Sequence, residues 1–369
     1  MDAKSPRVTL VHDWLNGMRG GEKCLEIFCR RWPDAALVTL LHKPGSVSAA
    51  IERLQPRTSF LQKIPGVHRF YRNLLPLMPL AIRRMIPESD LVVSSSHCVA
   101  KGIPVPAGTP HVCYCFTPMR YAWHMRESYG WRGMKGWMVD KVLTRIRDWD
   151  RKTAAGVTHF IAISREIQRR IRECYDRESV VIYPPVDTEF YTPAAEVRRE
   201  KHYLVVSAFA PYKRLDLAID ACRKLGRKLV VIGTGQAERK LRAAAGPAVE
   251  FLGWQSNEAI RDHLRRCRAL LFPGSEDFGI VPVEAMACGT PVIAMGEGGA
   301  TETVIPPGAW QPPTGLWFPE QTVDALVDGI ERFERHGSFD PSHLRRRAET
   351  FDTRRFEREF FAFVNEVLA

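Results

Sequence analysis

The chain has 369 residues, of which 45% are apolar and 26% are charged. This length predicts two domains of ordinary size, and the apolar fraction excludes a wholly disordered chain. Lysine and arginine number 53 against 42 acidic residues, which gives a net charge of +11. The surplus favours an anionic partner, and composition leaves nucleic acid, a membrane surface and a phosphorylated small molecule open.

Short apolar runs in the first half are typical of strands. They lie at 8–11, 37–41, 91–95, 111–115, 160–163 and 180–182, with helical patterns at 21–31 and 166–174. The second half repeats the alternation, with strands predicted at 203–207, 229–232, 249–252, 269–272 and 291–294 and helices at 215–224, 237–245, 257–266 and 282–287. Alternation of this kind predicts parallel sheets with helices on both faces.

The proline-bearing stretch from Tyr183 to about Lys201 is the predicted break, because the alternation restarts after it. We therefore expect an N-terminal domain at 1–190, a C-terminal domain at 191–350 and an amphipathic helix at 351–369. Doubly wound domains bind ligands at the carboxyl ends of their strands.

The cysteines and the apolar runs bear on the compartment. Nine cysteines are scattered without a Cys-x-x-Cys pair, so we expect free thiols in a reducing environment. No signal-peptide-like segment precedes the first strand, and the most lipid-like run, 74–82, is far short of the roughly 20 residues that span a bilayer. These features predict a cytoplasmic protein, with attachment at the inner face of the membrane left open.

The strongest constellation of polar residues follows the predicted strand at 269–272. A glycine-bearing loop carries Glu276, a helix begins near Pro282, and Glu284 lies one turn into it. The first amides of a helix, together with its dipole, suit a diphosphate. Two carboxylates beside a phosphate would repel it unless they bind something else, and neutral sugar hydroxyls meet that need. A solvated loop with a helix-capping acid is the alternative interpretation.

Two further segments follow predicted strands. Lys213 and Arg214 open the helix after the strand at 203–207, where two cations could neutralise a diphosphate or form a solvated helix face. The Gly-x-Gly at 233–235 lacks the third glycine of a dinucleotide fingerprint. In the first half, a glycine-rich turn at 13–23 suits close approach of backbone to a ligand, but it lacks the Gly-Lys-Ser/Thr ending of a P-loop.

The sequence SEDFGIVPVEAMACGTPVIA at 275–294 resembles the paired-glutamate signature of retaining GT-B glycosyltransferases of family 4. The stretches 20–22, 163–164, 183–187, 211–214, 298–304 and 314–316 also agree with that family. The resemblance covers nearly the whole chain, and its motifs are specific jointly rather than singly. The stretch at 113–123 further resembles a branch that contains mannosyltransferases of surface-polysaccharide assembly.

The resemblance implies an α/β GT-B fold, in which two doubly wound Rossmann-like domains face across a cleft. The C-terminal helix could pack on either domain, and its crossing back to the first is one of the two arrangements. It also implies that the donor is a nucleotide sugar, and that neither a further cofactor nor a metal is required. Lys213 would bind the diphosphate, Glu284 the ribose and Glu276 the hydroxyls of the transferred sugar.

Backbone groups complete the site that the resemblance implies. The amides of Gly279, Ile280 and Val281 would cradle sugar and phosphate, while Gly20 and Gly21 would approach the diphosphate from the other domain. Retention is expected to proceed by front-face attack, with the leaving phosphate helping to take the acceptor proton.

The sequence departs from the family at two positions. Ala208 stands where an arginine is common, five residues before the lysine, and Arg214 is the residue that could take part of its work. Phe116 stands where a histidine often contacts the transferred sugar, and His97 and His111 are the candidates to replace it.

Two stretches mix cations with large apolar side chains, namely 68–85 and 129–137. This mixture suits a surface resting on anionic lipid, where a lipid-linked acceptor would be presented, although the apolar residues could instead belong to the core. No nucleic-acid-binding module is recognisable, so nucleic acid is not an expected partner.

We expect a hexosyltransferase that acts on a glycan or lipid-linked acceptor, with GDP-mannose as the first donor to test and UDP-hexoses as the second. A catalytically inactive GT-B scaffold, which binds a nucleotide sugar or a partner enzyme, is the alternative from another functional class.

Overall fold

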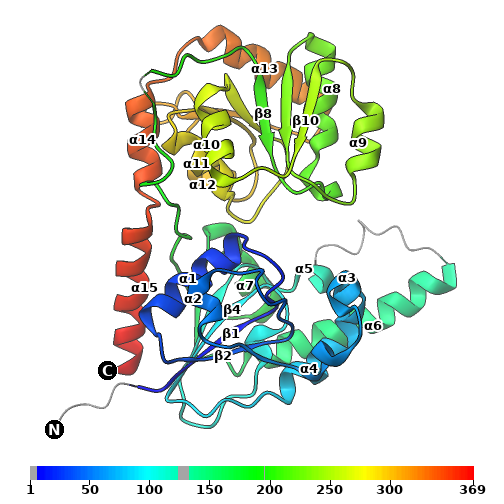
Figure 1. Ribbon diagram of the computed structural model, residues 1–369, viewed down its shortest axis with the longest axis vertical. Helices are drawn as coiled ribbons and strands as arrows, with labels where there is room; N and C mark the ends of the chain where they lie inside the picture. Colours follow the sequence, from blue (N-terminus) through cyan, green and yellow to red (C-terminus); the bar gives the residue numbers. More distant parts are fainter. Residues whose placement is uncertain (1–5, 124–132, 195) are drawn as a thin grey trace. The chain divides into compact units, whose positions relative to one another are not determined.

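The computed structural model describes residues 6–123, 133–194 and 196–369, without the side chains of 133–136. The chain separates into two compact units, each a sheet flanked by helices (Figure 1). Unit 1 comprises Met1–Tyr183 with Glu357–Ala369, and unit 2 comprises Pro184–Phe356. The boundary at Tyr183 lies where the proline-bearing stretch begins.

Unit 1 is built on a seven-stranded parallel sheet of order β3-β2-β1-β4-β5-β6-β7. Its strands are β1 (Val8–His12), β2 (Ala36–Thr39), β3 (Arg57–Thr58), β4 (Leu91–Ser96), β5 (His111–Cys115), β6 (His159–Ala162) and β7 (Ser179–Val181). The central strands are apolar along most of their length because helices cover both faces of the sheet. Since β2 and β4 lie on opposite sides of β1, the direction of winding reverses between β1 and β4.

The helices of unit 1 extend the sequence prediction. They are α1 (Gly20–Arg31), α2 (Ala49–Glu52), α3 (Val67–Phe70), α4 (Met78–Arg83), α5 (Arg120–Trp123), α6 (Gly133–Ala154) and α7 (Arg165–Tyr175), with 3-10 turns η1 (Phe60–Lys63), η2 (Tyr71–Leu77) and η3 (Ala100–Gly102). The long helix α6 was not among the predicted segments. Among the described residues, no helix combines the length and the apolarity needed to cross a bilayer.

Unit 2 has a six-stranded parallel sheet of order β10-β9-β8-β11-β12-β13. Its strands are β8 (Tyr203–Val206), β9 (Leu229–Ile232), β10 (Val249–Gly253), β11 (Ala269–Phe272), β12 (Val292–Met295) and β13 (Gly315–Phe318). Its helices are η5 (Pro211–Lys213), α8 (Leu215–Leu225), α9 (Glu238–Ala244), α10 (Asn257–Arg266), α11 (Ile280–Ala287), α12 (Ala300–Thr303), α13 (Val323–His336) and α14 (Pro341–Glu349). The winding reverses between β8 and β11, as it does between β1 and β4 in unit 1.

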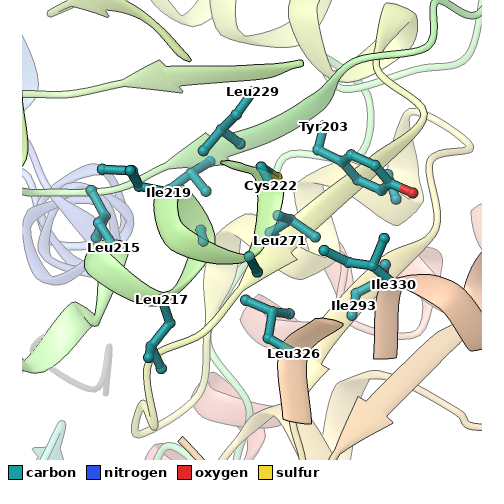
Figure 2. Close-up of a cluster of buried hydrophobic side chains, with 14 of the residues drawn as sticks. Tyr203, Leu215, Leu217, Ile219, Cys222, Leu229, Leu271, Ile293, Leu326 and Ile330 are labelled. Atoms are coloured by element: carbon teal, nitrogen blue, oxygen red, sulfur yellow. The ribbon is translucent and has the colours of Figure 1, made fainter. Parts of the chain in front are cut away.

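One hydrophobic cluster of unit 2 lies between its sheet and helices α8 and α13. Figure 2 shows Leu217 and Ile219 of α8 in one buried cluster with Leu271 of β11 and Leu326 and Ile330 of α13. Each such side chain contributes about 1.5–3 kcal/mol when it is removed from water. This packing fixes the strands whose carboxyl ends carry the predicted site.

The last helix, α15 (Thr353–Leu368), begins in unit 2 and ends in unit 1. The Phe360 ring is fully buried, with its centroid 4.4 Å from that of Phe28 and 5.8 Å from that of Tyr114. Of the two expected arrangements, the return of the C-terminal helix to the first unit is therefore the one found.

Candidate functional site

In unit 2, the residues predicted to bind a donor meet where the winding of the sheet reverses. Lys213 follows β8 and Glu276 follows β11, and these two strands are neighbours. The Nζ atom of Lys213 lies 2.5 Å from Oε2 of Glu276, with the two side chains only 16% and 19% exposed. Ligands of doubly wound sheets bind outside the strand ends at this kind of position. Two groups 63 positions apart in the numbering thus form one half-buried cation–carboxylate pair.

Glycines hold the loop that carries Glu276. The amide of Gly299 donates to the Glu276 carbonyl oxygen at 2.8 Å. A Cβ at Gly298 would lie 2.4 Å from that oxygen, and a Cβ at Gly299 would lie 2.2 Å from the Cα of Phe278. Both positions therefore require glycine, because any side chain would displace the backbone on which Glu276 is mounted.

Helix α11 begins beside this loop. Gly279 precedes it with a φ of 85°, which favours glycine, so the first turn of the helix presents the amides of Ile280 and Val281. No intrahelical acceptor exists for amides in a first turn. Glu284 is buried on the same helix in contact with Tyr191, and burial followed by the Glu284 charge raises the pKa of Tyr191 above its ordinary value.

Arg214 points to a different set of partners. Its guanidinium group contacts the Asp216 carboxylate at 3.1–3.3 Å and donates to the Gln321 carbonyl oxygen at 3.3 Å. These contacts use three of the five N–H groups of the guanidinium, so a diphosphate would compete with Asp216 for Arg214. Ala208, which stands where an arginine is common in the family, is exposed in the loop after β8.

In unit 1, a buried carboxylate lies where the winding of that sheet reverses. Asp13 directly follows β1 and accepts hydrogen bonds at 2.7–3.0 Å from the backbone amides of residues 97–100, which follow β4. The Nδ1 atom of His97 lies 3.1 Å from Oδ2 of Asp13. Burial raises the pKa of Asp13, but His97 and these amides outweigh it and lower the pKa to about 2.

The two histidines considered as replacements at position 116 lie at opposite edges of the sheet. His97 follows β4, and its ring centroid is 6.4 Å from that of Phe116, which follows β5. His111 begins β5, is buried, and has Nε2 2.8 Å from the Ser94 hydroxyl. Burial lowers the pKa of His111 to about 3. The structure thus brings His97, and not His111, to the edge where Phe116 lies.

Gly20 and Gly21 begin helix α1 at the same edge. A Cβ at Gly21 would lie 3.3 Å from the Phe116 ring and 3.5 Å from His12. The buried His12 has Nδ1 2.7 Å from the Ser95 hydroxyl, while its Nε2 lies 3.8 Å from Oε1 of Glu22. Burial alone would raise the pKa of Glu22, but the contact with His12 and its own backbone amide keep the pKa below its ordinary value.

Sequence reasoning did not single out His12, Asp13 or Glu22 as site residues. Polar side chains at the carboxyl end of an apolar strand are the available signal. Within the described ranges, no group of three histidine, cysteine or acidic side chains is arranged to hold a metal ion.

Two family models match the chain. Residues 18–190 match "Glycosyltransferase Family 4", and residues 188–350 match "Glycosyl transferases group 1". The chain belongs to the family 4, group 1 glycosyltransferases. The two matched regions contain the polar clusters at 20–22 and at 213–284.

Curated relatives of this family member match it over part of their length. An uncharacterized glycosyltransferase of Methanocaldococcus jannaschii is 34% identical over 153 residues, which are 39% of this chain and 42% of the relative. A D-inositol 3-phosphate glycosyltransferase of Kribbella flavida is 31% identical over 179 residues, or 41% of each chain. The chain therefore spans about two fifths of the length of these relatives.

Solved structures match over the whole fold. Anabaena HepE, crystallised with UDP, has a TM-score of 0.73 at 17% identity, covering 98% of this chain and 100% of its own. The sucrose-phosphate synthase of Thermosynechococcus elongatus has a TM-score of 0.71 at 16% identity, covering 98% of both chains. At these identities the likeness shows the fold, and it confirms the predicted GT-B class of two parallel-sheet Rossmann-like domains.

Proposed function

We propose that this glycosyltransferase transfers a hexose from a nucleotide sugar to a glycan or lipid-linked acceptor, with retention of anomeric configuration and without a metal ion. The Lys213–Glu276 pair carries the proposal. A cation for a diphosphate and a carboxylate for sugar hydroxyls lie in contact at the reversal point of unit 2. That arrangement suits a ligand with adjoining anionic and hydroxyl-rich parts, as a nucleotide sugar has.

Each group of unit 2 has a proposed role in that reaction. As the bond between sugar and diphosphate breaks, negative charge grows on the leaving phosphate, and Lys213 stabilises it together with the amides of Gly279, Ile280 and Val281. Glu276 accepts hydrogen bonds from the transferred sugar, and Glu284 binds the ribose. The acceptor attacks from the face that the diphosphate leaves, and the leaving phosphate helps to take its proton.

Unit 1 supplies the remaining proposed contacts. Gly20 and Gly21 approach the diphosphate, and His97 provides a polar group beside Phe116 for a sugar hydroxyl. Arg214 remains a proposed second cation for the phosphate, which would compete with the Asp216 carboxylate for its guanidinium group.

Two donors are proposed for testing. GDP-mannose is first, because residues 113–123 resemble a branch of the family that contains mannosyltransferases. A UDP-hexose is second, and the Anabaena HepE structures with UDP and with UDP-glucose support it. A thermal-shift screen of GDP-, UDP- and ADP-sugars distinguishes these donors, because a ligand at 100 times its Kd stabilises the folded state by about 2.7 kcal/mol. The sugars of one nucleotide are expected to raise the Tm of the protein more than those of the other two.

Turnover tests the reaction itself. Donor hydrolysis and transfer to simple sugars are measured for the unaltered chain and for Glu276→Ala, with Glu331→Ala on the exposed side of α13 as a matched loss of one acid. We expect Glu276→Ala alone to reduce turnover, EDTA to have no effect, and the product anomer seen by proton NMR to match that of the donor. An inverted anomer would refute retention, and dependence on an added divalent ion would refute metal independence.

The inactive-scaffold alternative is favoured by Ala208 and Phe116, which stand where an arginine is common and a histidine is frequent in the family. If nucleotide binds but no donor turns over above background, the scaffold is the correct interpretation.

Attachment to an anionic membrane surface is the second part of the proposal. Arg69, Phe70, Arg72, Leu77, Leu80, Arg83, Arg84 and Ile86 are all exposed on one segment of unit 1. In the same segment Ile82 and Met85 are buried, so the core interpretation holds for those two. In the second stretch, 129–132 lie outside the described residues, and Trp137 is exposed. Each cation near anionic headgroups contributes about 1 kcal/mol.

Vesicle sedimentation tests this attachment. The chain is expected to bind phosphatidylglycerol vesicles at low salt and not phosphatidylcholine vesicles, and Arg83→Glu with Arg84→Glu is expected to weaken the binding. Equal sedimentation with both lipids, or none with either, would refute the membrane proposal.

A further inference from the structure

The Asp13 carboxylate has an unusually complete set of donors. Oδ1 accepts from the amides of Val99 and Ala100 at 2.7 and 2.8 Å, and Oδ2 accepts from those of His97 and Cys98 at 2.7 and 3.0 Å. The side chain is fully buried. Four amide donors fix both the position and the orientation of this carboxylate.

The same carboxylate determines which nitrogen of His97 carries the proton. An ionised carboxylate has no hydrogen to donate, so the 3.1 Å contact between Oδ2 and Nδ1 requires a proton on Nδ1. The other nitrogen of a neutral imidazole is then a bare acceptor. Rotation of the ring by half a turn would place a carbon against Asp13. The Trp14 ring, nearly perpendicular to that of His97 with centroids 4.6 Å apart, also restricts it.

The neighbouring His12 makes the contrast clear. Its Nδ1 contacts Ser95, its Nε2 faces Glu22, and the residue is only 1% exposed. The His97 side chain is 30% exposed. Of these two rings at the reversal point of unit 1, His97 is the one that can reach a ligand.

We propose that Asp13 is a positioning residue that holds His97 in its Nδ1–H tautomer, so that Nε2 accepts a hydrogen bond from a sugar hydroxyl of the substrate. The Phe116 ring, with its centroid 6.4 Å from that of His97, supplies an apolar face beside this histidine. The inference rests on the proposed function for the identity of the ligand, but the tautomer itself does not depend on it.

Nitrogen-15 NMR of the full chain labelled at histidine tests the tautomer directly. We expect the His97 signals, assigned by their loss in His97→Gln, to show Nδ1–H and a bare Nε2 at pH 8. Asp13→Asn is expected to change this pattern, because an amide can rotate its NH₂ toward the ring. Finding Nε2–H in the unaltered chain would overturn the proposal without any use of activity.

Turnover with the donor identified by the thermal-shift screen tests the consequence. His97→Asn retains a donor to Asp13 near the Nδ1 position but lacks Nε2, so it is expected to fold normally and to lose about tenfold in kcat, the value of one good hydrogen bond. Asp13→Asn is expected to lose a similar factor, with the Kd for the nucleoside diphosphate unchanged within twofold. The double variant is expected to have the same kcat as His97→Asn, because both changes remove the same hydrogen bond from His97 Nε2 to the substrate.

Additive losses in the double variant, or full activity of His97→Asn, would overturn the role of His97. If Asp13→Asn fails to fold, the tautomer of the unaltered chain and the kinetics of His97→Asn still decide. If no donor turns over in the unaltered chain, the proposed function fails, whereas the tautomer measurement stands or falls separately.

Discussion

The contact between Lys213 and Glu276 predicts opposite effects of two substitutions on nucleotide affinity. With Nζ and Oε2 2.5 Å apart in the free protein, a diphosphate has to share the ammonium group with the carboxylate. Glu276→Gln removes both the competitor and a like charge, so GDP or UDP is expected to bind more tightly. Lys213→Ala removes the cation and leaves the carboxylate facing the diphosphate, so binding is expected to weaken.

The burial of the Lys213–Glu276 pair determines how large the changes in nucleotide affinity are expected to be. Truncating one member of a desolvated charge pair at a binding site costs about 2–5 kcal/mol. Both side chains are partly exposed, and Lys213 must first loosen its bond to Glu276, so we place the cost of Lys213→Ala at the low end, about 2 kcal/mol. This corresponds to about a 30-fold rise in Kd. For Glu276→Gln we expect a gain of about 1 kcal/mol, in the range of a partly exposed ion pair.

Isothermal titration with GDP and UDP at low salt measures these changes. Lys224→Ala removes an exposed cation that pairs with Asp324, and it is the matched control, with no expected effect. The double variant is expected to lose less affinity than Lys213→Ala, because no unpaired carboxylate remains. The reasoning is refuted if Lys213→Ala changes Kd by less than twofold, or if Glu276→Gln weakens nucleotide binding as strongly as Lys213→Ala does.

Three further outcomes are expected. Phe360→Ala removes a buried ring of unit 1 and should lower the free energy of unfolding by about 3–5 kcal/mol in urea titrations; a loss under 1 kcal/mol would contradict the observed packing. Gly299→Ala should lower nucleotide-sugar affinity at least tenfold, whereas Gly246→Ala, whose Cβ would have 3.8 Å of clearance, should leave it unchanged. Because the pKa of Asp13 is lowered to about 2, its ionisation stabilises the fold by about 2 kcal/mol above pH 4, and this contribution is lost as the pH falls from 4 to 2. Asp13→Asn should therefore flatten the dependence of the free energy of unfolding on pH in this range. An unchanged slope would contradict the lowered pKa of Asp13.

Local sequence patterns predicted most of the fold, because buried parallel strands are short apolar runs with helices between them. Strand β13 was not among the predicted strands. It opens with Gly315, which is typical of a turn, yet a Cβ there would lie 2.0 Å from the Val292 carbonyl oxygen, so close approach of the strands requires the glycine. Helix α6 was missed because its first residues belong to the stretch at 129–137, where the mixture of cations and large apolar side chains indicated a lipid-facing surface rather than one face of a helix.

The two candidate sites differed in how far sequence could reach them. Lys213 and Glu276 lie in extended motifs, so each could be proposed before the structure placed them in contact. Asp13 is one acid in a glycine-rich turn, and its partners begin 84 positions away. Asp13 meets these partners only because β1 and β4 are neighbours in the sheet, and a local sequence pattern does not predict that pairing.

The split composition of unit 1 bears on how the protein is made. Its first 183 residues leave the ribosome before any of unit 2, yet Phe28 and Tyr114 pack on Phe360, which is synthesised after the whole of unit 2. Domains generally fold in the order of their synthesis. Here unit 2 is one continuous segment of chain, whereas unit 1 lacks its last helix until synthesis ends. Until then the aromatic side chains that pack on Phe360 remain uncovered. We expect aggregation and chaperone binding of the nascent chain to be greatest during that interval.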